Sequence, residues 1–470
     1  RSATETLFLA PDGTPLKFFD AVVGGRAVGV PGVMRMLELA HQDHGTLQWS
    51  ALFEPAISAA TDGFAITPRL HFLLGRDRFL KASEVAGRFF YRDGEPLPVG
   101  YNLRNSALAR SLADIAWNGA TAMYRGPIAE AIVDAVQCHA TNPGVITQGD
   151  LANYEARRRE PLCTPYRRYR VCGMPPPTSG GVTVAQILGQ LYHLPIAAAE
   201  PGSARAIHLI SEAQRRAYAD RGLYLADSDF VNVPVDAMLR PAYLQRRAAT
   251  IDMDRSSGPV AAGNPLDHGW DFQPGADLSQ PSTTHFVVMD AAGDVVSMTS
   301  SVENAFGSRL MVGGFMLNNQ LTDFSFRPQD DDGRPVANRV EPGKRPRSSM
   351  SPTIVLNADD NSLRLAIGSP GGSRIIGYVA KTIVAVLDWG LDVQSAIDLP
   401  HHVNRNGPTD LEAGTAVAER AAALESMGHA VKLRVLNSGL HGIEQVAGVT
   451  RGGADPRREG VVLSGIDQAQ

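Results

Sequence analysis

The sequence has few cysteines and no recognisable metal-binding motif. Its 470 residues include three cysteines, Cys138, Cys163 and Cys172. An odd, scattered set without Cys-x-x-Cys spacing indicates neither a disulfide framework nor a zinc site. The twelve histidines include the adjacent pair His401 and His402, but they form no metal-ligand pattern, and we expect them to be structural. The sequence therefore implies no metal and no organic cofactor.

Long apolar runs and a strong excess of one charge are also missing. No stretch is long enough to span a membrane as a helix. No signal peptide is visible, but because the chain begins at Arg1 rather than at Met, this says little about location. The formal net charge of −5 gives no reason to expect nucleic acid or an anionic membrane as a partner. Hydrophobic residues make up 44% of the chain, so a large core can be buried.

The order of helix-like and strand-like segments indicates a layered protein of helices and sheets. Helical spacing of apolar residues predominates early, as in PIAEAIVDAVQCHA and AIHLISEAQRRAYADRGLYLAD. Later, short β-like runs such as TTHFVVMD, RLMVGGFMLNN and SLRLAIGS alternate with turns, and the helical run IIGYVAKTIVAVLDWG follows. This order favours an α+β or a layered αββα architecture, between which periodicity does not decide.

A long irregular segment leads directly into one of these strands. Residues 255–282, rich in Gly, Pro and polar residues, precede Thr283 and Thr284. Loops of this length inside compact proteins are uncommon and are usually functional or mobile. Two threonines at a strand start have an ordinary explanation, because β-branched residues are enriched in strands. The chemical alternative is a cut between Ser282 and Thr283, made when the Thr283 hydroxyl attacks the Ser282 carbonyl.

Such a cut would create a threonine that carries its own base. A threonine hydroxyl is a poor nucleophile without a neighbouring base. The α-amino group of a chain beginning at Thr283 would have an ordinary pKa of about 7.7 to 8, so it could accept the hydroxyl proton near neutral pH. The loop before the cut can move away, and the strand after it holds the new terminus in place.

Three further polar motifs follow Thr283. The consecutive glycines of GSPGGS, between a strand and a helix, either let backbone N–H groups point into a site, as an oxyanion hole requires, or make an ordinary turn. Ser348 and Ser349 precede a strand and either bind a carboxylate or cap a turn. Gln320 and Asp323 follow an apolar strand and either bind an ammonium group or form a polar turn. Each motif is weak alone, but all four in this order are a specific combination.

In combination these motifs resemble the γ-glutamyltranspeptidase family (glutathione hydrolases) of the N-terminal nucleophile hydrolase superfamily. The segments that carry the resemblance are TTHF, NNQLTDFS, RPRSSMSPT and GSPGGSR. Upstream, VGVPG, DLANYEA, PPPTSGG and AYADR extend it over essentially all of residues 1–470. The resemblance implies a four-layer αββα sandwich, made by one precursor that cuts itself into a large and a small subunit.

On this chain the resemblance implies two parts that form one intertwined domain. Residues 1–282 would be the large-subunit portion, without its N-terminal part and ending in a flexible loop. Residues 283–470 would be the small subunit, which starts at the nucleophile. The family's carboxylate-binding arginine would lie upstream of Arg1. Bacterial relatives are often periplasmic or secreted, and only the resemblance suggests this location.

The resemblance also implies a covalent mechanism. Thr283 would attack the γ-amide carbonyl of glutathione or another γ-glutamyl compound, and its freed amine would act as its base. The N–H groups of Gly371 and Gly372 would stabilise the oxyanion. The γ-glutamyl group would then pass to water, or to an amino acid or peptide acceptor, in a two-step reaction.

The γ-glutamyl group would be held at its two charged ends. Ser348 and Ser349 would bind its α-carboxylate, and Gln320 and Asp323 would bind its α-ammonium group. Between Asp323 and Ser348 the only aromatic residues are phenylalanines. We therefore expect no tyrosine lid of the kind that some family members have, and a site more open to bulky acyl donors or acceptors.

Two positions depart from the family pattern. Ser301 stands where the family has a threonine that touches the catalytic amine, and it keeps the hydroxyl. Glu303 stands where the family has an asparagine near the substrate ammonium, and its added negative charge favours an ammonium ligand. A shift of one residue would bring Asn304 into the site instead, but the Phe306-Gly307 pair that follows argues against it.

Two other functions fit parts of the pattern. An acylase for a glutaryl-type side chain, such as a cephalosporin acylase, would share Thr283 and the oxyanion hole without needing groups for an ammonium. The retained Gln320 and Asp323, together with Glu303, favour the amino-acid substrate. An uncleaved, inactive binding protein is the alternative of another class. The presence of every residue on the nucleophile side counts against it indirectly.

Overall fold

The chain divides into two compact units in the computed structural model, which describes residues 2–465 except 267, 277, 279 and 281. Unit 1 comprises residues 1–158, 301–322 and 340–343, and unit 2 comprises residues 159–300, 323–339 and 344–470. The bond between Ser282 and Thr283 therefore lies inside unit 2. No helix of the described residues is long and apolar enough to cross a membrane.

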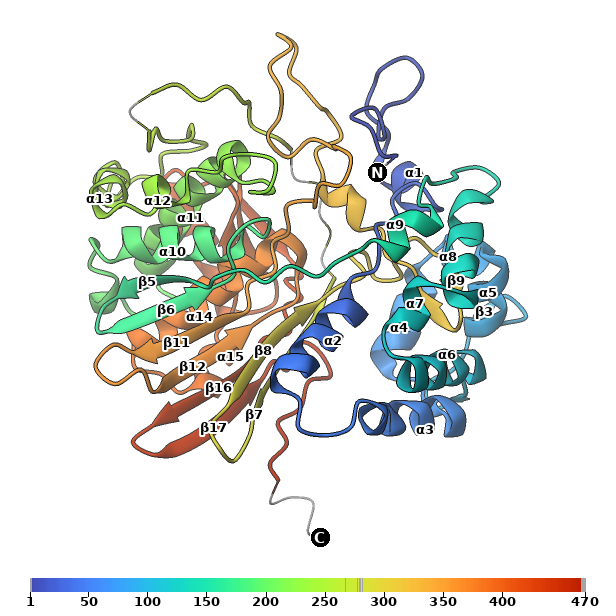
Figure 1. Ribbon diagram of the computed structural model, residues 1–470. Helices are drawn as coiled ribbons and strands as arrows, with labels where there is room; N and C mark the ends of the chain where they lie inside the picture. The colour runs from blue at the N-terminus through green and yellow to red at the C-terminus, as the bar shows by residue number, and fades with distance from the viewer. Residues whose placement is uncertain (1, 267, 277, 279, 281, 466–470) are drawn as a thin grey trace. The chain divides into compact units, whose positions relative to one another are not determined.

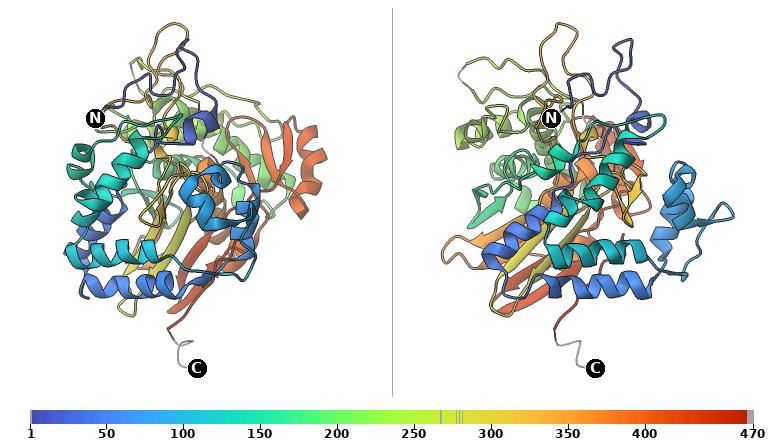
Figure 2. Two further views of the ribbon diagram at one scale, coloured as in Figure 1. Left: turned by 90° about the vertical axis from the view of Figure 1, so that its right-hand side faces the viewer. Right: turned by 45° about the vertical axis from the view of Figure 1, so that its right-hand side comes forward.

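Unit 1 is mainly helical, as the apolar spacing predicted (Figures 1 and 2). Its longer helices are α2 (Val33–His44), α3 (Glu54–Asp62), α4 (Pro68–Arg76), α6 (Ser106–Asn118) and α8 (Pro127–Gln137). Gly45 ends α2. Pro127 stands in the first turn of α8, where its missing N–H costs no helical hydrogen bond. Apolar residues of α6, α7 and α8 form one buried core, and a second core lies under α4 and α5.

Short elements complete unit 1. They are the helices α1 (Phe18–Val22), η1 (Ser50–Phe53), η2 (Leu80–Ala82), α5 (Glu84–Phe90), α7 (Thr121–Tyr124) and α9 (Gln148–Ala152). Two-residue strands pair as β1 (Phe64–Ala65) with β4 (Asn102–Leu103), β2 (Tyr91–Arg92) with β3 (Glu95–Pro96), and β9 (Met311–Val312) with β10 (Phe315–Met316). The β-like run RLMVGGFMLNN thus forms only the short β9–β10 hairpin, because Gly313 and Gly314, both at positive φ, turn the chain back.

Unit 2 is built on a six-stranded sheet with the strand order β17-β16-β12-β11-β6-β5. Every neighbouring pair is antiparallel. The strands are β5 (Leu162–Tyr166), β6 (Tyr169–Gly173), β11 (Thr353–Asn357), β12 (Leu363–Gly368), β16 (His441–Val446) and β17 (Val449–Ala454). Of these, β12 lies in the run SLRLAIGS that the sequence predicted as β-like.

Helices cover one face of this sheet (Figure 1). They are α10 (Gly180–Leu191), α14 (Ile375–Leu387) and α15 (Val393–Asp398), with α11 (Ala204–Tyr224) packed against α10. The core joins sheet residues such as Val355 and Ile367 to helix residues such as Ile187 and Ile383. Residues 375–386 of α14 are all buried, which explains why that segment is apolar all round.

Two strands stack on the other face of the sheet. β7 (Thr284–Met289) and β8 (Val295–Ser300) pair antiparallel, and they lie beside β12 and β16 in Figures 1 and 2. The His285 ring of β7 packs closely against Gly368 of β12, where a Cβ would lie 2.2 Å from the ring. Unit 2 is thus layered as helices, sheet and second sheet, and Thr283 directly precedes β7.

The remaining elements of unit 2 surround these layers. They are η3 (Ile196–Ala198), α12 (Val235–Met238), α13 (Pro241–Ala249), η5 (Gly372–Arg374), η6 (Ala416–Arg420), α16 (Ala421–Ser426) and the small sheet of β13 (His402–Asn404), β14 (Thr409–Glu412) and β15 (Val431–Arg434). Among its described residues, the segment 255–282 contains no helix and no strand of a sheet, so the irregular segment predicted there is confirmed.

The expectation for the cysteines was wrong in one respect. Cys163 and Cys172 form a disulfide, whereas the scattered positions of the cysteines had indicated none. The two residues face each other across β5 and β6 because the turn between Tyr166 and Tyr169 sets that register. Cys138 is free.

A buried ionic cluster fastens the start of the irregular segment to α11. Glu212 accepts hydrogen bonds from Arg215 at 3.1 Å and Arg216 at 2.7 Å, and from the Ser256 hydroxyl at 2.8 Å. All three side chains of the Glu-Arg-Arg group are buried. Burial opposes ionisation of Glu212, but the hydrogen bonds from Arg216 and Ser256 and the charge of Arg215 outweigh it and lower its pKa to about 2.

We predict that Glu212→Gln destabilises the fold by about 3–5 kcal/mol, because it leaves two buried guanidinium groups without their counter-charge. The midpoint of urea or thermal denaturation at neutral pH measures this. Since the pKa of Glu212 is lowered on folding, its contribution is complete above the ordinary value of 4.5 and is lost as the pH falls toward about 2.

The matched control is Glu84→Gln in the exposed helical pair Glu84–Arg88, which has the same spacing as Glu212–Arg216 and a separation of 3.0 Å. An exposed pair contributes at most about 1 kcal/mol. Equal losses of stability in the two variants would contradict the structural role given to Glu212.

Candidate active site

The bond expected to be cut lies against the glycine turn that follows β12. The Ser282 carbonyl oxygen accepts a hydrogen bond from the Gly371 N–H at 2.8 Å. Thr283 has a backbone φ of +87°, which a β-branched residue adopts only under strain. An N–H already placed on the carbonyl polarises it toward nucleophilic attack. Both features would favour attack on this carbonyl by a neighbouring hydroxyl.

The turn itself depends on its glycines. Gly371 and Gly372 have φ values of +142° and +60°, which other residues rarely adopt. A Cβ on Gly371 would also lie 2.7 Å from the ring of Tyr378. The turn joins β12 to η5 and α14, so the strand–turn–helix context predicted for GSPGGS is confirmed.

Arg458 holds the residue that follows this bond. Its Nη1 donates to the Thr283 carbonyl oxygen at 2.9 Å and its Nη2 to the Asn437 carbonyl oxygen at 3.4 Å. Gly439 lets the chain approach closely, since a Cβ there would lie 2.6 Å from Pro370 and 2.7 Å from Arg458. Sequence reasoning missed Arg458, because nothing in its local pattern distinguishes it from a surface arginine.

Ser348 and Ser349 lie in a polar network that α11 organises. Arg221 of α11 donates to the Ser349 hydroxyl oxygen at 2.7 Å and to the Ser179 hydroxyl oxygen at 2.7 Å. Ser179 in turn donates to the Ser348 carbonyl oxygen at 2.7 Å. Arg221 comes from AYADR and Ser179 from PPPTSGG, so two motifs that had no assigned role position the serine pair.

The residue after the glycine pair is held in the same way. The Tyr218 hydroxyl of α11 donates to the Ser373 carbonyl oxygen. Arg405, beyond β13, donates to the Ser373 hydroxyl oxygen at 2.7 Å. The glycine turn is therefore fixed from α11 and from the loop after β13. Neither contact can be read from the sequence, because each joins residues far apart in the chain.

Ser301 and Glu303 form a second group, in unit 1. The Glu303 N–H donates to the Ser301 hydroxyl oxygen at 2.9 Å. Glu303 is 4% exposed and has a φ of +71°. Its carboxylate accepts a hydrogen bond from the Asn319 amide, and the Asn319 amide oxygen accepts from the Asn304 N–H at 2.9 Å. The structure thus joins Glu303 to the NNQLTDFS motif through Asn319, a residue that sequence reasoning had quoted without a role.

Gln320 and Asp323 are carried by one turn, η4 (Gln320–Asp323). The Gln320 N–H donates to the Asn318 side chain at 2.9 Å. Asn318 also exchanges two hydrogen bonds of 2.9 Å with the backbone of Gly29, which belongs to the VGVPG motif. Asp323 falls in unit 2, where its carbonyl oxygen accepts from the Asn338 amide at 2.8 Å.

The phenylalanines after Asp323 are core residues. Phe324 is 2% exposed and Phe326 is 4% exposed, so neither side chain is available as a lid over a substrate. This agrees with the expectation that the segment supplies no aromatic cover.

One buried group has the composition of a metal site. Atoms of His208, Glu212 and His429 lie within 4.8 Å of one another. The His208 ring is bonded to the His429 ring at 2.8 Å and to the Asp252 carbonyl oxygen at 2.9 Å, and His429 is bonded to the Thr409 hydroxyl at 3.0 Å. Burial lowers the pKa of His429 to about 4. The ring nitrogens are thus engaged in hydrogen bonds with each other and with protein oxygens, and the group is part of the buried core.

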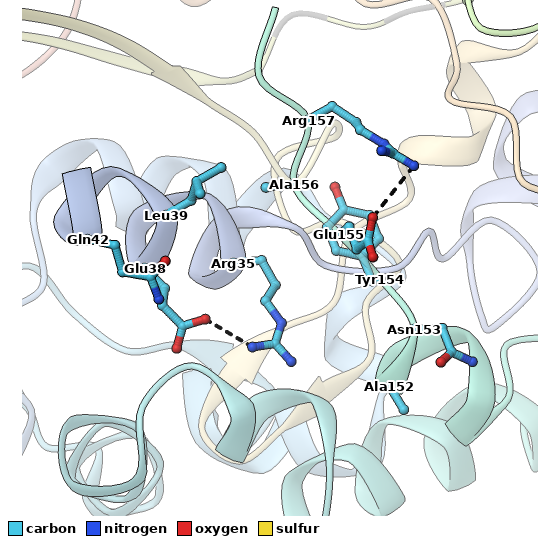
Figure 3. A pocket seen from close by; sticks show the side chains of 10 residues that line it. All are labelled: Arg35, Glu38, Leu39, Gln42, Ala152, Asn153, Tyr154, Glu155, Ala156 and Arg157. Carbon is cyan, nitrogen blue, oxygen red and sulfur yellow. Dashed lines mark hydrogen bonds and ion pairs between the residues drawn. The ribbon is translucent and has the colours of Figure 1, made fainter.

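A polar pocket of about 880 Å³ lies in unit 1 between α2 and the chain after α9 (Figure 3). Its charged groups are paired, Arg35 with Glu38 at 3.0 Å and Arg157 with Glu155 at 3.6 Å. The pocket therefore has no excess of either charge, and it contains none of the residues predicted for catalysis.

The whole chain is similar in sequence to known proteins. A family model described as Gamma-glutamyltranspeptidase matches residues 1–465. The chain is 35% identical to the glutathione hydrolase proenzyme of Bacillus subtilis (strain 168), over 98% of this chain and 78% of that protein. It is 36% identical to the acylase ACY 1 proenzyme of Pseudomonas sp. (strain SE83), over 87% of this chain and 70% of that protein.

A solved structure confirms the predicted fold class. The crystal structure of a cephalosporin acylase from Bacillus halodurans superposes with a TM-score of 0.78 at 24% identity, over 94% of this chain and 79% of that chain. The chain therefore shares the mixed helix and sheet fold of that acylase. Because the family model spans nearly the whole sequence and the curated relative matches over most of its own length, the chain belongs to the gamma-glutamyltranspeptidase family.

Proposed function

We propose that this protein is a γ-glutamyltransferase and glutathione hydrolase whose precursor cuts itself before Thr283. The observation that carries the proposal is the Ser282 carbonyl on the Gly371 N–H at 2.8 Å, in a chain whose family relative is named a proenzyme. Thr283 Oγ attacks the Ser282 carbonyl carbon, and the C–N bond breaks to leave an ester and a free amine. Water then hydrolyses the ester, which gives a large-subunit portion of residues 1–282 and a small subunit of residues 283–470.

After cleavage, the same groups would act on the substrate. Departure of Ser282 leaves the Gly371 N–H free to bind the γ-carbonyl oxygen of glutathione, with Gly372 as the second donor. The amine of Thr283 takes the proton of its own hydroxyl and gives it to the leaving amine. Arg458, bound to the Thr283 carbonyl oxygen at 2.9 Å, keeps the nucleophile in place. Ser301 contributes a hydroxyl beside the amine.

The charged ends of the γ-glutamyl group would be bound separately. Since Arg221 donates to the Ser349 oxygen, the Ser349 hydroxyl hydrogen is directed elsewhere and can be donated to the α-carboxylate, with Ser348 beside it. Gln320 and Asp323 bind the α-ammonium. Glu303 adds a second carboxylate for it.

Asn304, the alternative to Glu303, is engaged elsewhere. Its amide oxygen accepts from Arg309 at 2.7 Å, and Arg309 is also bonded to Asp77 at 2.5 Å. We therefore assign the ammonium to Glu303 rather than to Asn304, whose side chain is held by Arg309. The acceptor that follows the γ-glutamyl enzyme is water, an amino acid or a peptide.

The first prediction concerns the cut itself. Wild-type protein should give two fragments on denaturing intact-mass analysis, one of which begins at Thr283. Thr283→Ala should stay as a single chain, because it removes the attacking hydroxyl, and Thr283→Ser should still be cut. A wild-type chain that stays whole after prolonged incubation would favour the uncleaved binding protein instead.

The second prediction separates the two acyl donors. Glu303→Gln keeps the shape and removes the charge, so kcat/KM for a γ-glutamyl anilide should fall about tenfold, the effect of one charge-assisted hydrogen bond. Glutaryl anilide has no ammonium, and its kcat/KM should change little. The wild type and the variant are first checked for complete cleavage by mass. A preference of the wild type for glutaryl anilide would support the acylase.

The third prediction uses the close contact behind β7. Gly368→Ala pushes a methyl group into the His285 ring and displaces the strand that carries Thr283. A misplacement of about 1 Å can cost about a hundredfold in rate, so the fragments should appear far more slowly on denaturing gels. Gly75→Ala is the control, because the nearest atom to its Cβ would be Pro96 Cγ at 3.9 Å. Equal cleavage rates in the two variants would exclude this role.

A further inference from the structure

Unit 2 contains a pocket of about 720 Å³ outside the residues proposed for catalysis. One wall is the C-terminal part of α11, from Tyr218 to Leu223. A second wall is formed by residues 260–262 and 270–275 of the irregular segment. The third consists of residues 405–410 and the strand β15. All of these belong to unit 2.

The third wall carries an excess of positive charge. Arg405, Lys432 and Arg434 line the pocket, with Asp410 as the carboxylate among the lining residues. Asp410 is already shared by two guanidinium groups, Arg434 at 2.8 Å and Arg374 at 3.1 Å. Lys432 is exposed and makes no ion pair within the described part of the chain. The charges of the pocket in Figure 3 are, by contrast, paired with one another.

The wall formed by the irregular segment is aromatic. Trp270 and Phe272 line the pocket, with their ring centroids 5.3 Å apart. The Trp270 indole N–H is bonded to the Leu223 carbonyl oxygen at 3.4 Å, which holds the ring against the end of α11. Planar groups stack on such rings, and cations on the facing wall attract anionic groups.

Hydrogen bonds join the wall formed by the irregular segment to each of the other two walls. The Asn406 side chain exchanges two hydrogen bonds of 2.8 Å with the backbone of Val260. The Gly275 N–H donates to the Gly222 carbonyl oxygen at 3.0 Å. The irregular segment is therefore connected by defined contacts to α11 and to the loop after β13.

We propose that this pocket binds a small organic anion that has a planar, aromatic body and carboxylate or phosphoryl oxygens. The anionic groups bind Lys432, Arg434 and Arg405, and the planar body lies against Trp270 and Phe272. A ligand in this position connects the cationic wall to the segment that precedes Thr283 and holds that segment in place.

The probe is isophthalate, an aromatic dicarboxylate, measured by isothermal titration calorimetry on full-length Thr283→Ala protein. This variant keeps the irregular segment attached whether or not the wild type cuts itself, so the test is independent of the proposed function. We expect saturable binding with a Kd below about 1 mM. Neutral benzamide should bind at least tenfold more weakly, and aliphatic glutarate more weakly than isophthalate.

The decisive variant is Lys432→Gln, which removes an exposed charge and no described contact. Isophthalate affinity should fall about fivefold, the effect of one partly exposed ion pair. Lys81→Gln, an exposed lysine of unit 1, is the matched control and should leave the affinity unchanged. No binding at 10 mM probe (roughly the weakest affinity of interest), equal binding of benzamide, or equal affinity of the two lysine variants would overturn the proposal.

A second readout follows the segment itself. Bound isophthalate should slow chymotrypsin cleavage after Trp270 and Phe272, as seen from the masses of the fragments, and Lys432→Gln should reduce this protection. Cleavage at these residues that is unaffected by saturating probe would place the ligand elsewhere and overturn the assignment.

Discussion

The hydrogen bond from the Gly371 N–H to the Ser282 carbonyl is the contact on which the candidate site depends. It forms because β12 ends in a glycine turn whose positive φ values aim the N–H at that carbonyl. It also needs β7 to lie close to β12, and the missing side chain of Gly368 makes this possible by leaving room for the His285 ring. The glycine turn and Gly368, which have no side chains, thus determine where the Thr283 hydroxyl lies relative to the Ser282 carbonyl.

A single buried helix organises the groups around this contact. Because α11 is enclosed on nearly all sides, its polar residues must find partners inside the protein. Glu212 pairs with two arginines and fastens the start of the irregular segment, while Tyr218 holds Ser373 and Arg221 holds Ser349. The desolvation cost of these groups is offset by bonds to the segments that the chemistry needs in fixed positions.

Charge is distributed unevenly over the protein, although the chain as a whole is mildly acidic. In the pocket of unit 1, arginines and glutamates neutralise each other. In unit 2, Arg374 and Arg434 already share Asp410. Asp410 therefore does not neutralise the positive charges of Lys432 and Arg405. Disulfides such as Cys163–Cys172 persist mainly in oxidising environments.

The sequence by itself determined the longer helices, most of the strands, the irregular segment before Thr283 and the glycine turn, because apolar periodicity and turn chemistry are local properties. It also gave the family through the order of its motifs. The disulfide, the contact of Arg458 with Thr283, the network of Arg221 and the cationic pocket were decided by the tertiary structure alone. Each of these features brings together residues that are apart in the chain, through the register of strands or through packing in the folded protein. A local sequence pattern does not predict such a contact.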